Sequence, residues 1–255
     1  MTTESTRTST RLGLVHGFTQ TSQCWGRLGD RLARDTEIVL IDAPGHGVSA
    51  DLELDLWGGA AMIAERLGRG TLLGYSLGGR LALHTTLAHP DAVDRLVLIS
   101  ATAGIDDPAA RTARRDDDEQ LARHLELIGV GPFIDEWLAR PMFARLPRSG
   151  DCEAARRSNT VAGLSASLRR CGVGAQDPLW DRLAEIQVPT LLIAGALDTK
   201  FVNLAERLAD SISLSALEVI ADAGHACHLE RPDEVADIVE HWINGGSRSA
   251  GSSPA

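Results

Sequence analysis

The chain of 255 residues lacks the features that mark membrane proteins and nucleic-acid-binding proteins. Its apolar runs are all shorter than the roughly 18 residues that a membrane-spanning helix needs, so we expect no membrane partner. The first ten residues, MTTESTRTST, have no apolar core of the kind that export signals carry. The formal net charge of -10 disfavours nucleic acid as a partner, because neutralising phosphates requires a basic surface. We therefore expect a cytoplasmic protein that is a monomer or a weak homo-oligomer.

Cysteine is scarce and scattered. The four cysteines are Cys24, Cys152, Cys171 and Cys227. None of them forms the closely spaced pair that a zinc site or a redox motif requires. We expect four free thiols in a reducing compartment, and no metal site.

What the sequence does contain is a regular series of short apolar runs, each of the length of a strand that is buried on both faces. The runs are RLGLVHG, EIVLIDAPG, GTLLGYS, RLVLISA, PTLLIAG and ALEVIADAG. Helix-like segments separate most of them, and this alternation predicts a mostly parallel sheet with helices on both faces, the α/β class.

The alternation fails between about residues 103 and 180, where amphipathic helical stretches follow one another without a strand-like run. We interpret this segment as a helical cap inserted into a single domain of residues 11–244. The polar ends, residues 1–10 and 245–255, are expected to be disordered tails.

One short stretch, TLLGYSLGGRLAL, places Ser76 in a G-x-S-x-G pattern between a strand-like and a helix-like run. This is the context of a nucleophile elbow, a sharp turn in which small neighbours make room for a strained backbone. Gly74 and Gly78 supply that room. The pentapeptide alone is short enough to arise by chance, so its weight depends on suitable partners elsewhere in the chain.

Suitable partners follow two later strand-like runs: Asp198 comes after PTLLIAG, and His225 after ALEVIADAG. A serine hydroxyl becomes a useful nucleophile or base when an imidazole removes its proton, and the imidazole needs an acceptor that fixes its tautomer. The order Ser, Asp, His at successive strand ends is that of the α/β-hydrolase fold. We predict that Ser76, Asp198 and His225 form a catalytic triad.

A triad of this kind works with an oxyanion hole made of backbone amides. We predict that the amides of Phe18, just after the first strand-like run, and of Leu77, just after the serine, form it. The other histidines are interpreted as structural: His46 lies in a Gly/Pro turn, and His228 has no carboxylate partner at a strand end.

With these residues placed, the chain resembles the α/β-hydrolase superfamily over about residues 12–244. Within it, the chain is similar to the 2-succinyl-6-hydroxy-2,4-cyclohexadiene-1-carboxylate synthases of menaquinone biosynthesis. The resemblance rests on LVHGF, GYSLGGRLAL, EWLARPMFARL, RRSNTVAGLSASLRRCGVGAQDPLW and GALDTKF. The last three are the most specific, because a generic hydrolase has no reason to share the sequence of its cap.

The resemblance implies an elimination in which a proton leaves a cyclohexene substrate, pyruvate is expelled and a conjugated diene forms. Ser76, activated by His225 and Asp198, would be the base, and no metal or organic cofactor is implied. The Phe18 and Leu77 amides would hold the charge that develops on the succinyl carbonyl oxygen.

The implied partner is a small polycarboxylate, for which arginine offers bidentate recognition. The resemblance assigns Arg80 and Arg157 as carboxylate clamps, and Tyr75 and Trp137 as pocket residues. It also leads us to expect an arginine before DEQLA, where Arg114 and Arg115 both qualify. Arg115 is our choice.

Two alternatives remain open. The same triad would serve a serine carboxylesterase or a carbon-carbon bond hydrolase, with Ser76 as a true nucleophile. A noncatalytic binding protein could also keep the scaffold, although an intact triad disfavours that reading.

Overall fold

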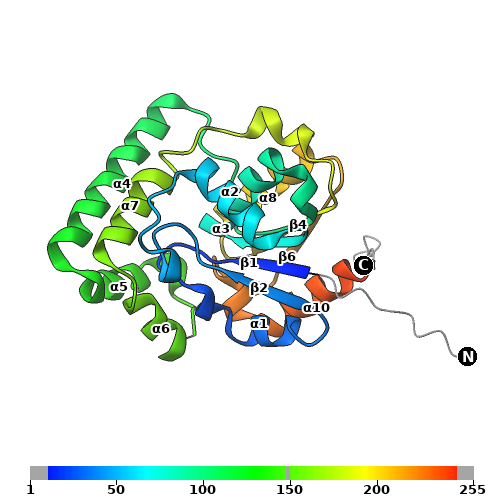
Figure 1. The fold of residues 1–255 in the computed structure, drawn as a ribbon, viewed down its shortest axis with the longest axis horizontal. Helices are drawn as coiled ribbons and strands as arrows, with labels where there is room; N and C mark the ends of the chain where they lie inside the picture. The colour runs from blue at the N-terminus through cyan, green and yellow to red at the C-terminus, as the bar shows by residue number, and fades with distance from the viewer. Residues whose placement is uncertain (1–10, 148–149, 246–255) are drawn as a thin grey trace, which may run out of the picture.

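The computed structural model describes residues 11–147 and 150–245, so most of both expected tails lies outside the described residues. Six strands form one parallel sheet in the order β2-β1-β3-β4-β5-β6 (Figure 1). They are β1 (Arg11–Val15), β2 (Glu37–Ile41), β3 (Gly70–Tyr75), β4 (Val93–Ile99), β5 (Thr190–Gly195) and β6 (Ser215–Ile220). Each of the six predicted strand-like runs overlaps one of them, although β4 and β6 begin before their runs, so the α/β class is confirmed. The strand order reverses between β1 and β3, and ligands of open parallel sheets bind beyond the strand ends at such a point.

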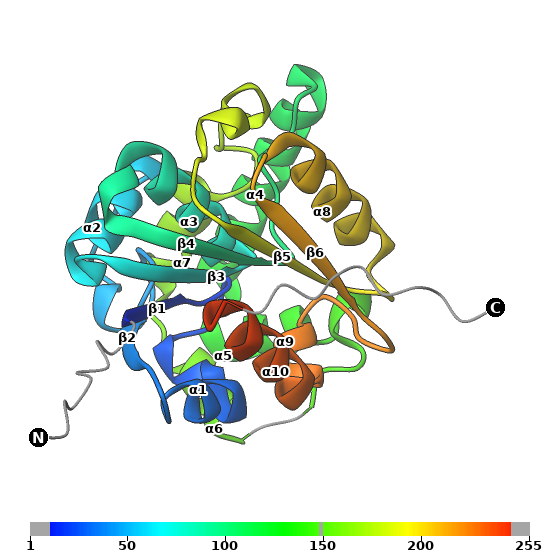
Figure 2. The same cartoon turned by 90° about the vertical axis from the view of Figure 1, so that its right-hand side faces the viewer.

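Helices cover both faces of the sheet (Figure 2). Successive strand residues point to opposite faces; in β3, Leu72 joins the apolar cluster on one side and Leu73 the cluster on the other. One face carries α2 (Leu56–Leu67), α3 (Leu77–Ala88) and α8 (Thr199–Ser211), and the other carries α1 (Gly26–Leu32), α9 (Cys227–Glu230) and α10 (Pro232–Ile243). The short 3-10 helices are η1 (Ser22–Trp25), η2 (Gly47–Ser49), η3 (Pro90–Ala92), η4 (Pro141–Phe143) and η5 (Trp180–Glu185).

Four helices fill the segment for which the sequence predicts a cap, and Figure 1 shows them together beyond one end of the sheet. They are α4 (Pro108–Ile128), α5 (Val130–Leu138), α6 (Gly150–Arg157) and α7 (Val161–Cys171). Their own apolar cluster includes Leu125, Phe133 and Leu164, each at most 1% exposed. Phe18, from the loop after β1, packs against both this cluster and a cluster of the sheet. None of the described helices has the length and apolar character of a membrane span.

The longest cap helix, α4, has clear local start and stop signals. The Asp107 side chain accepts a hydrogen bond from the backbone amide of Ala110, and Pro108 occupies the first turn, where its missing N–H costs nothing. The helix ends at Ile128, and the next residue, Gly129, has a φ of 79°, which glycine adopts without strain. These local signals fix where α4 begins and where it ends.

One sequence expectation is wrong. The structure joins Cys24 and Cys152 in a disulfide, so the chain does not contain four free thiols. Cys24 lies in η1 beside the sheet and Cys152 in α6 of the cap, 128 residues later, so their spacing carried no signal for the pairing. Cys171 and Cys227 are free and buried. The bond links α6 of the cap covalently to η1, which follows β1.

Reducing this disulfide is expected to destabilise the protein. Removing a cross-link from a folded domain typically costs about 2–5 kcal/mol, which corresponds to a fall in Tm of roughly 5–15 °C for a chain of this size. Tm should be measured by scanning calorimetry with and without a phosphine reductant, together with a thiol count by mass spectrometry. The Cys24→Ser variant should have a Tm near that of the reduced wild type, and the reductant should not change that Tm. Equal melting of the oxidised and fully reduced wild type would contradict the expectation.

Candidate active site

Ser76 lies between β3 and α3, in the sharp turn that the sequence predicts. Its φ is 52°, a conformation that costs a residue other than glycine of order 1–3 kcal/mol. Its backbone amide donates to the Ile99 carbonyl at 2.9 Å, which ties the turn to β4. A Cβ on Gly74 or Gly78 would collide with backbone atoms, so neither position accepts a side chain without moving α3 away from the sheet.

His225 connects Ser76 to Asp198. Its Nε2 lies 3.2 Å from the Ser76 Oγ, and its Nδ1 lies 2.7 Å from the Asp198 Oδ2. Because the carboxylate can only accept, Nδ1 carries the proton, and Nε2 is left to accept from the serine hydroxyl. The imidazole is 2% exposed and packs against the Phe201 ring, 4.4 Å away between centroids. The structure thus brings the three predicted side chains together in a geometry that can move a proton off the serine.

The loop after β1 makes a tight turn next to Ser76. The Gln20 amide donates to the Gly17 carbonyl at 3.1 Å, and Thr19 has a φ of 68°. Phe18 and Leu77 both line the cavity above Ser76, and within the described residues neither backbone amide donates to a protein acceptor. Both predicted oxyanion donors are therefore available to an oxygen atom bound beside Ser76.

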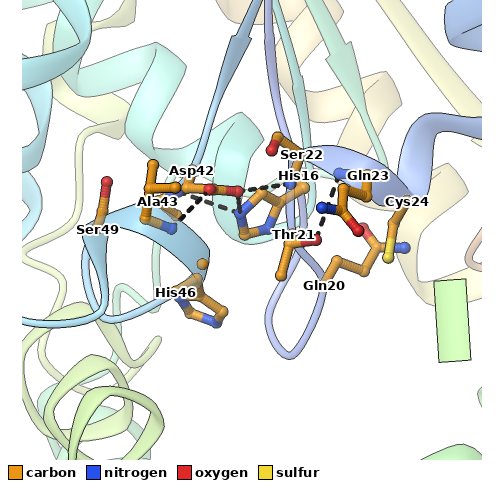
Figure 3. Close-up of polar contacts among 12 residues, drawn as sticks. His16, Gln20, Thr21, Ser22, Gln23, Cys24, Asp42, Ala43, His46 and Ser49 are labelled. Carbon is orange, nitrogen blue, oxygen red and sulfur yellow. Dashed lines mark hydrogen bonds and ion pairs between the residues drawn. The ribbon is translucent and has the colours of Figure 1, made fainter. Parts of the chain in front are cut away.

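Asp42, at the end of β2, anchors the segments around this turn (Figure 3). Its carboxylate accepts from the backbone amides of Ser22 and Val48 and lies 3.4 Å from the His16 ring. Burial alone would raise the pKa of Asp42, but the hydrogen bonds from the Val48 and Ser22 amides outweigh it and lower the pKa. The His16 Nε2 accepts from the Ala43 amide at 3.1 Å, so this ring also joins the ends of β1 and β2.

A cavity of about 780 Å³ opens above Ser76, between the sheet and the cap. The sheet side of its wall includes Phe18, Tyr75, Ser76, Leu77, Arg80 and His225, and the cap side includes Arg114, Trp137, Arg140, Phe143, Arg156 and Ser167. Among the described residues, the Trp137 Nε1 and the Ser167 Oγ are buried without a hydrogen-bond partner. The wall therefore combines aromatic surface with polar atoms that a ligand could satisfy.

Two arginines in this wall are buried cations that the described part of the chain does not neutralise. Arg80 is 6% exposed and donates to the Cys171 carbonyl at 2.6 Å, and Arg156 is 2% exposed and donates to the Thr19 hydroxyl. Burial lowers the pKa of each guanidinium to about 10, so both stay charged at neutral pH. An uncompensated buried charge is costly, and an anionic ligand would remove that cost.

Arg157, the predicted clamp, lies outside the cavity wall. It pairs at the surface with Asp135 at 2.6 Å and with Glu153 at 2.8 Å. Neighbouring residues of a helix point about 100° apart, so when α6 turns Arg156 into the cavity, Arg157 must face away. The arginine pair was visible in the sequence, but its orientation was not.

In the pair Arg114 and Arg115, too, the residue that lines the cavity is not the predicted one. Arg114 lines the cavity and pairs with Asp118 at 2.8 Å. Arg115 is exposed and donates to the Gly174 carbonyl at 3.3 Å, outside the cavity wall. Arg114, and not the predicted Arg115, is thus the arginine of this pair that lines the cavity.

The two predicted aromatic residues both line the cavity. Trp137 packs its ring against Phe18, 5.1 Å between centroids, and carries the Arg140 guanidinium 4.1 Å above its ring. Tyr75 is 3% exposed and packs against His228, 4.2 Å between centroids. His228 is thus buried beneath the site, as the structural interpretation of that residue requires.

His46 is likewise part of the framework. Its Nε2 accepts from the Thr19 amide at 3.1 Å, and burial lowers its pKa to about 3, so the ring is neutral. No group of three or more His, Cys, Asp or Glu side chains in the described ranges is arranged to hold a metal ion.

Three buried histidines should make the protein labile to acid. Burial lowers the pKa of His46 to about 3, of His84 to about 4 and of His228 to about 3, each from 6.5. The unfolded chain therefore binds more protons than the folded one below about pH 6.5. The stability that these neutral rings provide is complete above that pH and is lost as pH falls toward 3–4, at about 1–2 kcal/mol for each ring by pH 5.

The measurement is Tm as a function of pH between 7.5 and 4.5. His84→Gln should flatten the dependence of Tm on pH, whereas His241→Gln, at an exposed position on α10, should leave it unchanged. A Tm that stays constant down to pH 4.5 would refute the linkage.

Comparisons with known proteins extend over the sheet and the cap alike. Residues 14–238 match the model of a family described as "Alpha/beta hydrolase family". A Bacillus subtilis protein named "Putative 2-succinyl-6-hydroxy-2,4-cyclohexadiene-1-carboxylate synthase" is 32% identical over 90% of this chain and 88% of its own length. The 2-succinyl-6-hydroxy-2,4-cyclohexadiene-1-carboxylate synthase of Pectobacterium atrosepticum is 30% identical over 90% of this chain and 92% of its own.

Two solved structures are also similar. The structure of MenH from S. aureus has a TM-score of 0.88 at 30% identity, covering 93% of this chain and 94% of its own. A hydrolase from Pseudomonas aeruginosa PA01 has a TM-score of 0.74 at 26% identity, covering 93% and 90%.

Proposed function

The chain belongs to the alpha/beta hydrolase family, and we propose that within it the chain is a lyase of menaquinone biosynthesis. The reaction eliminates pyruvate from 2-succinyl-5-enolpyruvyl-6-hydroxy-3-cyclohexene-1-carboxylate and leaves the 2,4-cyclohexadiene that gives the relatives above their name. The observation that carries the proposal is the pair of buried guanidinium groups, Arg80 and Arg156, that share one cavity with Ser76. A substrate with several carboxylates fits such a cavity, whereas a neutral ester would leave both charges uncompensated.

The first step is removal of the ring proton next to the succinyl carbonyl. The Ser76 hydroxyl passes its proton to the His225 Nε2, 3.2 Å away, as its oxygen takes the proton from carbon. Asp198, held at 2.7 Å from Nδ1, stabilises the imidazolium that forms. The electron pair from the broken C–H bond is delocalised onto the succinyl carbonyl oxygen and then returns to the ring, the ring double bond shifts, and the C–O bond to the enolpyruvyl group breaks. The departing enolpyruvate takes up the proton held by His225 and becomes pyruvate, which leaves the imidazole neutral again.

The negative charge that develops on the succinyl carbonyl oxygen needs donors in place before it forms. Phe18 and Leu77 line this cavity, and their backbone amides, which have no acceptor among the described residues, would supply them. Leu77 is also the first residue of α3, so the positive end of that helix adds to the stabilisation.

Arg80 and Arg156 would bind carboxylates of the substrate, each through two parallel hydrogen bonds. Arg114 lies in the same wall, but its ion pair with Asp118 already offsets much of its charge. The unpartnered Trp137 Nε1 and Ser167 Oγ are neutral donors for further substrate oxygens. The cavity thus offers enough donors to hold a polycarboxylate in one orientation above Ser76.

A serine hydrolase, either a carboxylesterase or a carbon-carbon bond hydrolase, is the second candidate. The strained position of Ser76 beside His225 favours it, because the same hydroxyl can attack a carbonyl carbon. In that case an acyl group would accumulate on Ser76 and be released by water.

The deciding experiment supplies the purified protein with the enolpyruvyl substrate and follows pyruvate by coupled reduction with NADH. Diene absorbance is recorded in parallel. We expect equal amounts of pyruvate and diene, and no mass increase on Ser76. A burst of alcohol from a chromogenic ester with a trapped acyl group, in the absence of pyruvate release, would favour the hydrolase and reject the lyase.

A further inference from the structure

Thr19, one residue beyond Phe18, is strained and fully enclosed. Its φ of 68° is unusual for a β-branched residue, and its exposed fraction is 0%. Such conformations persist where the surroundings over-determine them, and they cluster at functional sites. All three polar groups of Thr19 are engaged: its amide donates to His46, its hydroxyl accepts from Arg156 and its carbonyl accepts from Asn159 at 2.9 Å.

Two of these three contacts come from the cap. Asn159, just after α6, is 6% exposed and joins three segments through one side-chain amide. Its Nδ2 donates to the carbonyls of Thr19 and Arg156, at 2.9 and 3.0 Å, and its Oδ1 accepts from the Gly47 amide at 3.0 Å. Both N–H groups are used, so the orientation of the amide follows from its partners. Asn159 does not line the cavity above Ser76, so any effect it has on the reaction must pass through the residues that it holds, the turn at Thr19 or Arg156, and the split between kcat and KM separates the two.

We propose that Asn159 is a positioning residue that holds, from the cap, the turn that aims the Phe18 amide into the cavity. Thr19 and Phe18 are the two central residues of that turn, so releasing the Thr19 carbonyl lets the strained φ relax and rotates the neighbouring peptide groups. The oxyanion hole is therefore complete only when Asn159, at the end of α6, is hydrogen-bonded to the Thr19 carbonyl. The test of this inference by pyruvate release rests on the proposed function, whereas the test by chemical labelling of Ser76 does not.

The test compares Asn159→Ala with Thr160→Ala. Thr160 is the next residue, and its hydroxyl caps α7 by accepting from the Gly163 amide at 3.0 Å, without touching Thr19. Both variants should lower Tm. Only Asn159→Ala should lower kcat for pyruvate release, by about 10- to 100-fold, with KM within about threefold, because a misplaced donor weakens transition-state binding and leaves substrate contacts intact. Thr160→Ala should keep kcat within about twofold.

Asn159→Asp provides a second variant in case the alanine protein does not fold. It keeps the size of the side chain and the oxygen that faces Gly47, and it removes both N–H donors, so the same loss of kcat is expected. Unchanged kcat in these variants would overturn the proposal. So would a loss confined to KM, or a loss of kcat equal to that of Thr160→Ala.

The second assay measures the rate at which a small fluorophosphonate labels Ser76, since phosphonylation also places charge on an oxygen in the oxyanion hole and needs no lyase activity. Fluoride leaves as the serine oxygen bonds to phosphorus, and the hydroxyl proton goes to His225. Labelling should slow in both Asn159 variants and not in Thr160→Ala. If the wild type is labelled but releases no pyruvate, the proposed function fails, and the labelling rates alone decide the role of Asn159. A wild type that is neither labelled nor active would overturn both.

Discussion

Replacing Ser76 with alanine should lower kcat for pyruvate release by about 10³- to 10⁴-fold and leave KM within a few-fold. The hydroxyl oxygen is the atom that the 3.2 Å contact with His225 makes basic, and without it the imidazole has no group through which to take the substrate proton. The cations that hold the carboxylates stay in place, so ground-state binding survives. Steady-state kinetics and a direct binding titration measure the two effects separately.

Ser158→Ala is a suitable control for this change, because among the described residues its hydroxyl bonds only to the Ala155 carbonyl, at the end of α6. It should retain the wild-type kcat. Full pyruvate release by Ser76→Ala would remove the serine from the mechanism, and unchanged biological activity in that variant would favour a binding protein built on a hydrolase scaffold.

Replacing Arg80 with methionine should lower kcat/KM by about 10²- to 10³-fold, mainly through KM, because truncating one partner of a buried charged pair costs about 2–5 kcal/mol. Lysine should restore only part of this loss, since it offers a point charge where arginine offers two parallel donors. In the free enzyme the guanidinium is buried without an ion-pair partner in the described ranges, and burial lowers its pKa to about 10. Removing it should therefore leave Tm unchanged or raise it.

The neighbouring pair on α6 supplies a matched comparison. Arg156→Met should behave like Arg80→Met, since Arg156 is 2% exposed in the same cavity wall. Arg157→Met should keep kcat/KM within about twofold, because the contacts it removes, the ion pairs with Asp135 and Glu153 and the hydrogen bond to the Gly131 carbonyl, lie outside the cavity wall. If the Arg157 variant loses more activity than the Arg156 variant, the orientation of α6 described here is wrong for the working enzyme.

Much of the site could be predicted because it lies at strand ends. In a parallel sheet the carboxyl ends of all strands meet at one edge, so Ser76 after β3, Asp198 after β5 and His225 after β6 were expected to lie near one another. The local signals were also strong: glycines surround the serine, and apolar runs of the right length precede all three residues. Distances of 3.2 and 2.7 Å now join them, while their catalytic roles stay predictions.

The residues that sequence reasoning missed depend on contacts between distant segments. Asn159 was read only as part of a family-like stretch, and its contacts with Thr19 and Gly47 span more than 100 residues. Nothing in the spacing of Cys24 and Cys152 indicated that α6 would bring them together. Such pairings follow from how the cap packs against the rest of the domain, and no local sequence pattern indicates that packing.

By itself, then, the sequence determined the class of sheet, the elbow at Ser76 and the order of the acid and the histidine, because hydrophobic periodicity and turn chemistry act over a few residues. Only the tertiary structure decided that Arg156 and Arg114 face the cavity while Arg157 and Arg115 do not. The physical reason is that a rotation of about 100° separates neighbouring helical residues. The rotation of each whole helix about its own axis is set by the packing of the cap, and an arginine pair looks the same in the sequence whichever member turns inward.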